Sequence, residues 1–175
     1  MRLLVINNKS NFIESLKNIL SKYEVTIVPF NEISLDEIKK FDKIILSGGH
    51  SLCVKNHDKD YQKELEIIKK SGKPIFGICL GFELIGYAFG EKLEKIKDDR
   101  ILFGLNNRFE VYESHRWVIK NTNFLVPLAK SKDGIEIVKH PDKKIYGSQF
   151  HPEVFVEKTQ GHKIIENFLH LENFK

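Results

Sequence analysis

The first half of the chain alternates short apolar runs with segments of helical periodicity, and this alternation constrains the fold more than any other feature. Residues 2–7 (RLLVIN) form an apolar run, and in the segment that follows, Phe12, Leu16 and Ile19 recur at helical spacing. A short apolar run is typical of a buried strand, whereas recurrence once per helical turn is typical of an amphipathic helix. The first elements predicted are therefore a strand and then a helix.

The same pairing recurs further along the chain. Strands are expected at 24–30 (EVTIVPF), 43–49 (KIILSGG) and 74–78 (PIFGI), and helical patterns follow them at 34–41, at 60–70 and after Cys79. In the first of these helical segments, Ser34 precedes Glu37 at capping-box spacing. Strand and helix thus alternate four times, which predicts a parallel sheet with helices on both faces.

The second half of the chain has a different character. The segments RFEVYES, FLVPLAKS, GIEIVKH and KIYGSQF have partly alternating polarity and are separated by Asn, Asp, Gly or Pro. We interpret them as antiparallel or mixed strands that extend the sheet. Near the end, Ile164, Ile165 and Phe168 predict a closing helix. The predicted fold class is α/β, with a mostly parallel central sheet, helices on both faces and added antiparallel strands in the second half.

Composition sets broad limits on the function. At 175 residues, with 41% hydrophobic and 30% charged side chains, the chain is expected to form one domain over residues 1–175. The formal charge of +4 comes from well-mixed charges without a basic block, so no nucleic-acid partner is expected. Two cysteines, an opening MRLLVINNK and the lack of a long apolar run predict a soluble, cytoplasmic protein with no membrane partner.

Cys79 lies in GICLG, between an apolar run and a helical pattern. This is the strand, turn and helix context of a nucleophile elbow, in which Gly77 and Gly81 would leave room for a strained turn. A helix that begins just after the cysteine is expected to favour the thiolate. The alternative is that Cys79 is a small buried core residue. Cys53 has no comparable setting, and we interpret it as a buried or incidental thiol.

A catalytic cysteine needs a base and a group that fixes the tautomer of that base. His151 follows an apolar run, Pro152 stiffens the turn, and Glu153 lies two residues on, so that in extended chain both side chains project to one side. His151 is the predicted base and Glu153 its orienting carboxylate. The remaining histidines are interpreted mainly as surface residues; those considered were His50, His57, His140, His162 and His170. No metal is expected, because neither H-E-x-x-H nor paired C-x-x-C spacing occurs.

The strand predicted at 43–49 ends in Ser47, Gly48 and Gly49. Ligands bind at the carboxyl ends of parallel strands, and adjacent glycines let backbone N–H groups approach a substrate closely. With the N–H of Leu80 they are predicted to stabilise an oxyanion. An ordinary Gly-Gly turn is the alternative interpretation.

Four motifs occur in an order and at a spacing that resemble the class I (triad) glutamine amidotransferases. They are Ser47-Gly48-Gly49, Gly77-Ile78-Cys79-Leu80-Gly81, Ser114-His115 and Gln149-Phe150-His151-Pro152-Glu153-Val154. The resemblance spans nearly the whole chain. Within this class the segments EVYESH, IEIVKH and IYGSQFHPEV are most similar to the separate glutaminase subunit of archaeal-type GMP synthetase.

The resemblance implies a flavodoxin-like glutaminase domain that needs no cofactor. It implies that Cys79 forms a γ-glutamyl thioester with L-glutamine, that His151 and Glu153 complete the triad, and that Gly49 and Leu80 form the oxyanion hole. It further implies that ammonia passes to a separate ATP-dependent synthetase subunit, which converts XMP to GMP. The substrate-binding residues that it implies are Ser47, Gly48, Glu83, Ser114, His115 and Arg116.

The chain departs from the family pattern at several points. Glu83 stands where the family usually has Gln, His50 follows the glycine pair in place of Pro, and INNKS replaces a DNGGQ-like start. The segment between Gly90 and Phe109 looks shorter than in relatives. Two alternatives therefore stay open: a free-standing hydrolase of γ-glutamyl compounds, and a catalytically weak or inactive regulatory protein.

Overall fold

A seven-stranded sheet forms the centre of the computed structural model, which describes residues 1–49, 52–96, 103–106 and 109–171. Its strands follow the order β2-β1-β3-β4-β11-β10-β9. The first five in this order are parallel, and β10 and β9 are added antiparallel. The strands span Arg2–Asn8 (β1), Glu24–Pro29 (β2), Lys43–Gly49 (β3), Ile75–Ile78 (β4), Val126–Lys130 (β9), Ile135–Lys139 (β10) and Ile145–Ser148 (β11).

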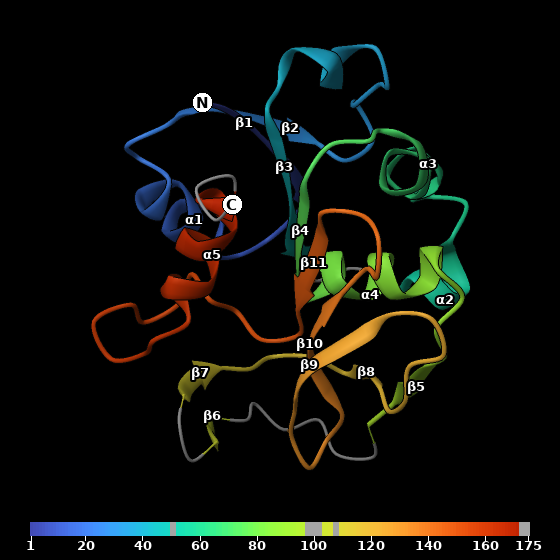
Figure 1. Cartoon of the computed structure of the whole chain (residues 1–175), viewed down its shortest axis with the longest axis vertical. Coiled ribbons are helices and arrows are strands. Elements are labelled where there is room, and N and C mark those ends of the chain that lie inside the picture. Colours follow the sequence, from blue (N-terminus) through green and yellow to red (C-terminus); the bar gives the residue numbers. More distant parts are fainter. Residues whose placement is uncertain (50–51, 97–102, 107–108, 172–175) are drawn as a thin grey trace.

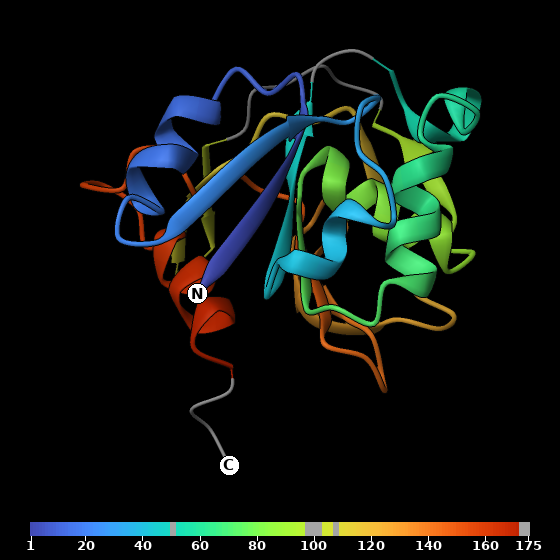
Figure 2. The same cartoon turned by 90° about the horizontal axis from the view of Figure 1, so that it is seen from above.

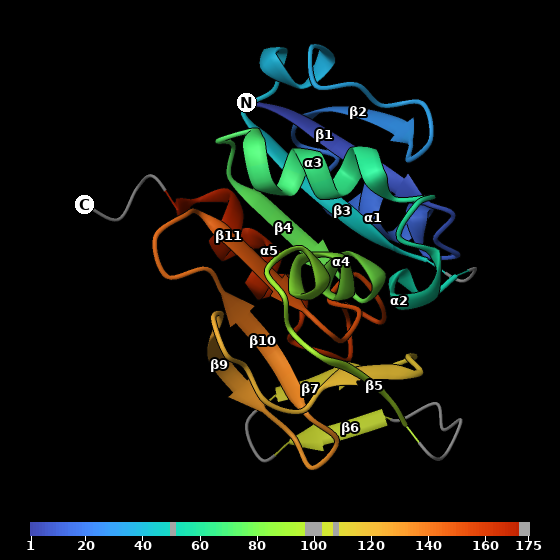
Figure 3. The same cartoon turned by 90° about the vertical axis from the view of Figure 1, so that its right-hand side faces the viewer.

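Helices cover both faces of this sheet, as the alternation in the sequence predicted. Helices α1 (Ile13–Ile19) and α5 (His162–Leu169) lie on one face, and α2 (Val54–His57), α3 (Gln62–Lys70) and α4 (Leu80–Ala88) lie on the other (Figures 1, 2 and 3). Alternate residues of β1 supply the two hydrophobic cores: Leu3 and Val5 pack with α1 and α5, and Leu4 and Ile6 pack with α3 and α4. The predicted fold class is confirmed.

Two small antiparallel sheets lie beside the end of the main sheet that carries β9 and β10 (Figure 1). Strand β5 (Leu93–Lys95) pairs with β8 (Trp117–Ile119), and β6 (Phe103–Asn106) pairs with β7 (Phe109–Tyr112). The expectation that the segment RFEVYES extends the main sheet was therefore wrong for β7. Strands β5 and β8 were not predicted, because segments of three residues are too short to show alternation.

The helix expected at 34–41 is a single 3-10 turn, η1 (Glu37–Lys40). The backbone N–H and the hydroxyl group of Ser34 both donate to the Glu37 carboxylate, at 3.2 and 3.1 Å. Only the Glu37 half of the capping box therefore forms, since the Ser34 hydroxyl is used by the carboxylate and not by the backbone of the turn. Among the described residues, no helix has both the length and the apolar character needed to cross a bilayer.

Glu91 connects the end of α4 to the start of β9. Its buried carboxylate accepts hydrogen bonds from the backbone N–H groups of Asn123, Phe124 and Leu125, at 2.8, 2.9 and 2.7 Å. Three consecutive N–H groups that converge on one carboxylate form a charge-assisted anchor. Glu91 thus fixes the chain where it enters the antiparallel edge of the sheet.

We expect Glu91→Gln to lower the free energy of unfolding by about 1–3 kcal/mol, because an amide group turns a donor toward at least one of these buried N–H groups. Urea denaturation of the two proteins measures the difference. Glu94→Gln is the matched control, since Glu94 forms only a partly exposed ion pair with Lys92, and its loss should cost about 0.5 kcal/mol or less. Equal costs for the two variants would show that Glu91 is not an anchor.

Candidate active site

Cys79 lies at a strained turn between β4 and α4. Its backbone has φ 48° and ψ −101°, its side chain is buried, and its N–H donates to the backbone oxygen of Ser148 at 2.8 Å. Glycines flank the turn because a Cβ on Gly77 would lie 2.4 Å from the oxygen of Gly81, and a Cβ on Gly81 would lie 2.4 Å from the oxygen of Leu46. The turn thus has the strand-to-helix geometry expected from the sequence.

The Cys79 thiol donates a hydrogen bond to the backbone oxygen of Ser114, at 3.6 Å from Sγ. Burial raises the pKa of this thiol well above its ordinary value, and the carboxyl groups of Glu83 and Glu153 add to the increase. The N–H of Leu80, at the start of α4, has the opposite effect. The expected helix contribution is therefore present but outweighed, and in this state the sulfur keeps its proton.

His151 follows β11, and contacts from several directions fix its position. Its Nδ1 donates to Glu153 Oε1 at 2.9 Å, and its backbone N–H donates to the oxygen of Tyr112 at 2.8 Å. The ring of Phe12 packs edge-on against the imidazole, with the centroids 4.9 Å apart. Both His151 and Glu153 are buried. Because Glu153 occupies Nδ1, Nε2 is the ring nitrogen that remains for proton transfer.

Gly48 brings the cysteine and the histidine into one site. The position that a Cβ on Gly48 would occupy lies 2.7 Å from Cε1 of His151 and 3.6 Å from Cβ of Cys79. The two side chains therefore flank the same backbone position of β3. Only glycine leaves space for the imidazole there, and the structure brings together three predicted site residues from distant parts of the sequence.

Asn8, at the end of β1, holds the residues predicted to form the oxyanion hole. Its N–H donates to Ser47 Oγ at 2.9 Å, and its Nδ2 donates to the oxygen of Ser47 at 3.1 Å. The Ser47 hydroxyl in turn donates to the oxygen of Gly48. Asn8 pairs with Gly49 in the sheet, and a Cβ on Gly49 would lie 2.6 Å from Leu80 Cδ2. Gly49 and Leu80 thus lie side by side. The Ser47 hydroxyl makes its hydrogen bonds to the backbone of Asn8 and Gly48.

The Ser114-His115 motif lies beside the thiol. Ser114 contributes the backbone oxygen that accepts from Cys79. His115 is buried, with Nδ1 3.1 Å from the oxygen of Trp117 and Nε2 3.9 Å from Glu113 Oε2. Burial lowers the pKa of His115, but the nearby carboxyl groups of Glu113, Glu136 and Glu83 outweigh it and raise the pKa above its ordinary value. Arg116 is exposed, so the structure places it at the rim.

Carboxyl groups gather near the thiol and His115. Glu83, on α4, is buried, and burial raises its pKa to about 8, while His115 and the Gln149 amide act in the opposite direction. Burial and a neighbouring carboxylate raise the pKa of Glu136 to about 7, and the hydroxyl of Ser131 donates to it at 2.6 Å. Both amide atoms of Gln149 are buried without a hydrogen-bond partner in the described structure. Buried donor and acceptor atoms without a partner among the described residues thus occur on Gln149 and Glu136.

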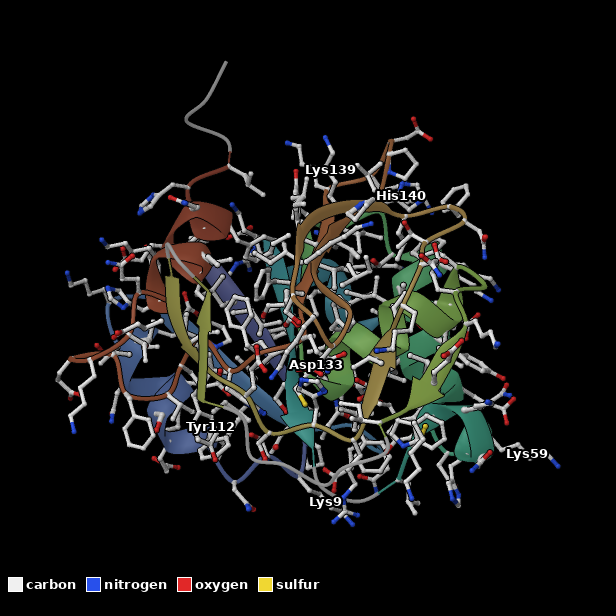
Figure 4. The ribbon with its side chains drawn as sticks, turned by 90° about the horizontal axis from the view of Figure 1, so that it is seen from below. Lys9, Lys59, Tyr112, Asp133, Lys139 and His140 are labelled. Atoms are coloured by element: carbon white, nitrogen blue, oxygen red, sulfur yellow. The ribbon has the colours of Figure 1, made fainter. Side chains whose placement is uncertain are left out.

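Sequence reasoning missed Asn8 and Phe12. Asn8 was detectable, because it directly follows the strand predicted at 2–7, next to where the third strand ends, and carboxyl ends of parallel strands meet at one edge. Figure 4 shows Lys9, which follows β1, and Tyr112 toward one edge of the molecule, and Lys139 and His140 at the opposite edge. Nothing in the local pattern around Phe12 indicated a contact with His151.

Two of the departures from the family pattern fall outside the described residues. They are His50 and, within the segment expected to be short, residues 97–102 and 107–108.

Together these features define a class: α/β proteins with a cysteine, a histidine and a carboxylate grouped at the carboxyl ends of the parallel strands. Within residues 1–49, 52–96, 103–106 and 109–171, no group of three or more His, Cys, Asp and Glu side chains is arranged to hold a metal ion.

Comparison with known proteins agrees with this class. The family model for glutamine amidotransferase class-I matches residues 4–171, and the chain belongs to this family. A subunit of glutamine-hydrolyzing GMP synthase from Methanothermobacter thermautotrophicus is 36% identical and aligns over 95% of each chain. Anthranilate synthase component 2 of Saccharolobus solfataricus is 31% identical over 95% of this chain and 96% of the relative. A solved structure from Thermoplasma acidophilum, described as a GMP synthase subunit, superposes with a TM-score of 0.83 at 28% identity, covering 98% of this chain and 93% of that one.

We expect Gly48→Ala to reduce glutamine hydrolysis by about tenfold to a hundredfold, because the new methyl group displaces the His151 imidazole and small misplacements of catalytic groups are costly. Steady-state assays measure the loss. Gly90→Ala is the control: Gly90 has φ 80° and open space around it, so its substitution should strain the backbone but leave turnover unchanged. Equal turnover of Gly48→Ala and the unmodified protein would contradict the placement of His151 against β3.

Proposed function

We propose that this chain hydrolyses L-glutamine through a thioester on Cys79 and delivers the ammonia to a separate synthetase subunit. The observation that carries the proposal is the packing of Cys79 and of the His151–Glu153 pair against the same backbone position, Gly48. Family membership supports the reaction class, and the geometry supports the roles proposed for the three residues.

In the proposed reaction, His151 Nε2 takes the proton of Cys79 as the sulfur attacks the carboxamide carbon of glutamine. The oxyanion that forms accepts hydrogen bonds from the backbone N–H groups of Gly49 and Leu80. When the carbon–nitrogen bond breaks, the imidazolium returns the proton to the leaving nitrogen, which departs as ammonia. A water molecule, deprotonated by His151, then attacks the thioester and releases glutamate, and the proton returns to the sulfur. Glu153 stabilises the imidazolium throughout.

The relatives support a separate acceptor enzyme. The relatives named as subunits of GMP synthase align with this chain over nearly the full length of both. The amidotransferase domain takes up this aligned length, which leaves no room in it for a synthetase domain. We therefore propose that the partner is an ATP-dependent GMP synthetase subunit, with XMP as the acceptor of the ammonia. The relative named anthranilate synthase component 2 shows that the family also serves other acceptors, so partner choice requires a direct test.

The resting thiol supports control by that partner. Cys79 is protonated, buried and bonded to the backbone oxygen of Ser114, so it must leave this contact before His151 can take its proton. We propose that docking of the synthetase subunit promotes this change, which prevents glutamine from being consumed without an acceptor.

We expect glutamine turnover to rise severalfold when the chain is mixed with the GMP synthetase subunit, and Cys79→Ala to abolish turnover under both conditions. Glutamate release measures both results. The large component of anthranilate synthase is the matched comparison, because a relative of this chain is named component 2 of that enzyme, and it should give no increase. Full activity of the isolated chain, together with cleavage of γ-glutamyl peptides, would instead identify a free-standing γ-glutamyl hydrolase.

An electrophilic glutamine analogue tests for an inactive protein. Such an analogue should alkylate Cys79 and leave Cys53 unmodified, because only Cys79 lies beside a base and oxyanion donors. Peptide mass spectrometry locates the adduct. Cys79 that stays unmodified, with and without the synthetase, would identify a regulatory protein that has kept the fold.

Glu83 provides a second test, through the α-ammonium group of glutamine. Free Glu83 is protonated at neutral pH because burial raises its pKa to about 8. If the ammonium group binds beside it, as we propose, Glu83 ionises on binding, so glutamine binding releases a proton and strengthens as the pH rises from 6 to about 8. Calorimetry of Cys79→Ala in buffers of different ionisation enthalpy counts the protons. Addition of Glu83→Gln should abolish the release, and an unchanged release would place the ammonium group elsewhere.

A further inference from the structure

Glu64, on α3, is a buried acid that the proposed reaction does not use. Its exposed fraction is 0%, and neither carboxyl oxygen has a hydrogen-bond partner in the described structure. Burial raises its pKa to about 8, and its polar neighbour is the side-chain amide of Asn8. A buried acid in this setting holds its proton at neutral pH.

Asn8 interacts with Glu64 and also bonds to Ser47, which precedes the glycines of the proposed oxyanion hole. Its Nδ2 is used by the oxygen of Ser47, which fixes the orientation of the amide, and its Oδ1 is buried without a hydrogen-bond partner. Unpaired oxygens thus occur on both neighbouring side chains. Two acceptors can share a hydrogen bond only if one of them carries a proton.

We infer that Glu64 is a positioning residue, which donates a proton in a hydrogen bond to Asn8 Oδ1 and thereby holds Asn8 against Ser47 and Gly49. The bond satisfies both buried groups at once, and the amide then fixes the end of β3 through the two hydrogen bonds to Ser47. The part of the inference that concerns catalysis rests on the proposed role of Gly49 in the oxyanion hole.

No charged side chain competes with Asn8 for Glu64 among the described residues. The charged groups of the surrounding elements are Lys63, Glu66, Lys69 and Lys70 of α3, Arg2 of β1, Lys9 after β1, Lys43 of β3 and Glu83 of α4, and Lys69 and Arg2 are exposed. Lys63 donates to the oxygen of Asn31, and Lys70 pairs with Glu66. Lys9 lies over the ring of Phe30, Lys43 donates to backbone oxygens of α5, and Glu83 faces His115 and Gln149.

The buried proton on Glu64 makes the stability of the fold depend on pH in a definite direction. Because the pKa of folded Glu64 is raised, the folded chain keeps a proton that the unfolded chain loses near the ordinary glutamate pKa. The contribution of Glu64 to stability is therefore fully present below that pKa and is lost as the pH rises to about 8. Glu64→Gln should remove this dependence, since its amide donates to Asn8 at every pH.

The first experiment measures the urea midpoint of unfolding from pH 5 to pH 9. The midpoint of the unmodified protein should fall relative to that of Glu64→Gln up to about pH 8 and then stay parallel to it. Glu66→Gln, on the same helix, is the matched control and should follow the unmodified protein. Parallel curves for Glu64→Gln and the unmodified protein would show that Glu64 does not keep a buried proton in the folded chain.

The second experiment tests positioning with Glu64→Leu, which fills the space without a donor. We expect it to lower kcat for glutamine at least tenfold at pH 7 with little change in KM, whereas Glu64→Gln should keep kcat within about twofold and lose the decline in kcat above pH 8. Since Asn8 transmits the effect, adding Asn8→Ala to Glu64→Leu should cost nothing beyond Asn8→Ala alone. Unchanged kcat in a folded Glu64→Leu would refute positioning.

Amide hydrogen exchange separates this inference from the proposed function. Exchange at Gly48 and Gly49 should accelerate at least tenfold in Glu64→Leu and stay unchanged in Glu64→Gln, whether or not the protein hydrolyses glutamine. An inactive protein with this exchange pattern would reject the glutaminase role and retain the Glu64–Asn8 bond. Equal exchange in both variants would reject the bond, even in an active enzyme.

Discussion

The site depends on backbone segments that pack without side chains between them. Gly77 lies against the backbone of Gly81, and Gly81 lies against the backbone of Leu46, so that β4, α4 and β3 meet at distances that no Cβ would allow. This close approach forces the turn at Cys79 into a positive φ, and the hydrogen bond from its N–H to Ser148 holds the turn in place. Because β3 is drawn close, Gly48 and Gly49 reach the same edge as the thiol. Removal of any one of these contacts would separate nucleophile, base and oxyanion donors.

Burial sets the charge state of the site as strongly as it sets the geometry. The Cys79 thiol and the carboxyl groups of Glu64 and Glu83 all have raised pKa values for one main reason, which is the loss of water around the charged form. The site therefore rests with its protons in place. In the proposed reaction, charge forms only where an opposite charge stabilises it: Glu153 would stabilise an imidazolium, and a substrate ammonium group would stabilise a carboxylate at Glu83. A protonated resting site of this kind suits an enzyme that should not act before its substrate and partner are bound.

The sequence predicted the parts of the fold that local patterns encode. Apolar runs and helical spacing located β1, β3, β4, α1 and α4, and the GICLG and HPE segments located the residues that meet at Gly48. It failed where tertiary contacts override local pattern. Residues 34–41 have the spacing of a helix, but the Ser34 hydroxyl binds Glu37 and the segment makes only one 3-10 turn. Phe12 and Glu64 belong to segments whose local sequence carries no catalytic motif, so only their packing reveals them.

The two halves of the site rest on different kinds of support. The nucleophile stands on the parallel sheet, where strands on both sides and α4 fix the backbone of Cys79. The base depends on a single antiparallel bridge to Tyr112, on Glu153 and on the edge of Phe12. Tyr112 ends β7, which belongs to a separate two-stranded sheet and not to the central one. The backbone oxygen of Ser114, which accepts from the Cys79 thiol, comes two residues after the end of β7. A force applied to β7 would therefore act on His151 and on the thiol contact together. It follows that a partner docked against β7 can change both contacts while the backbone turn at Cys79 stays fixed by the central sheet.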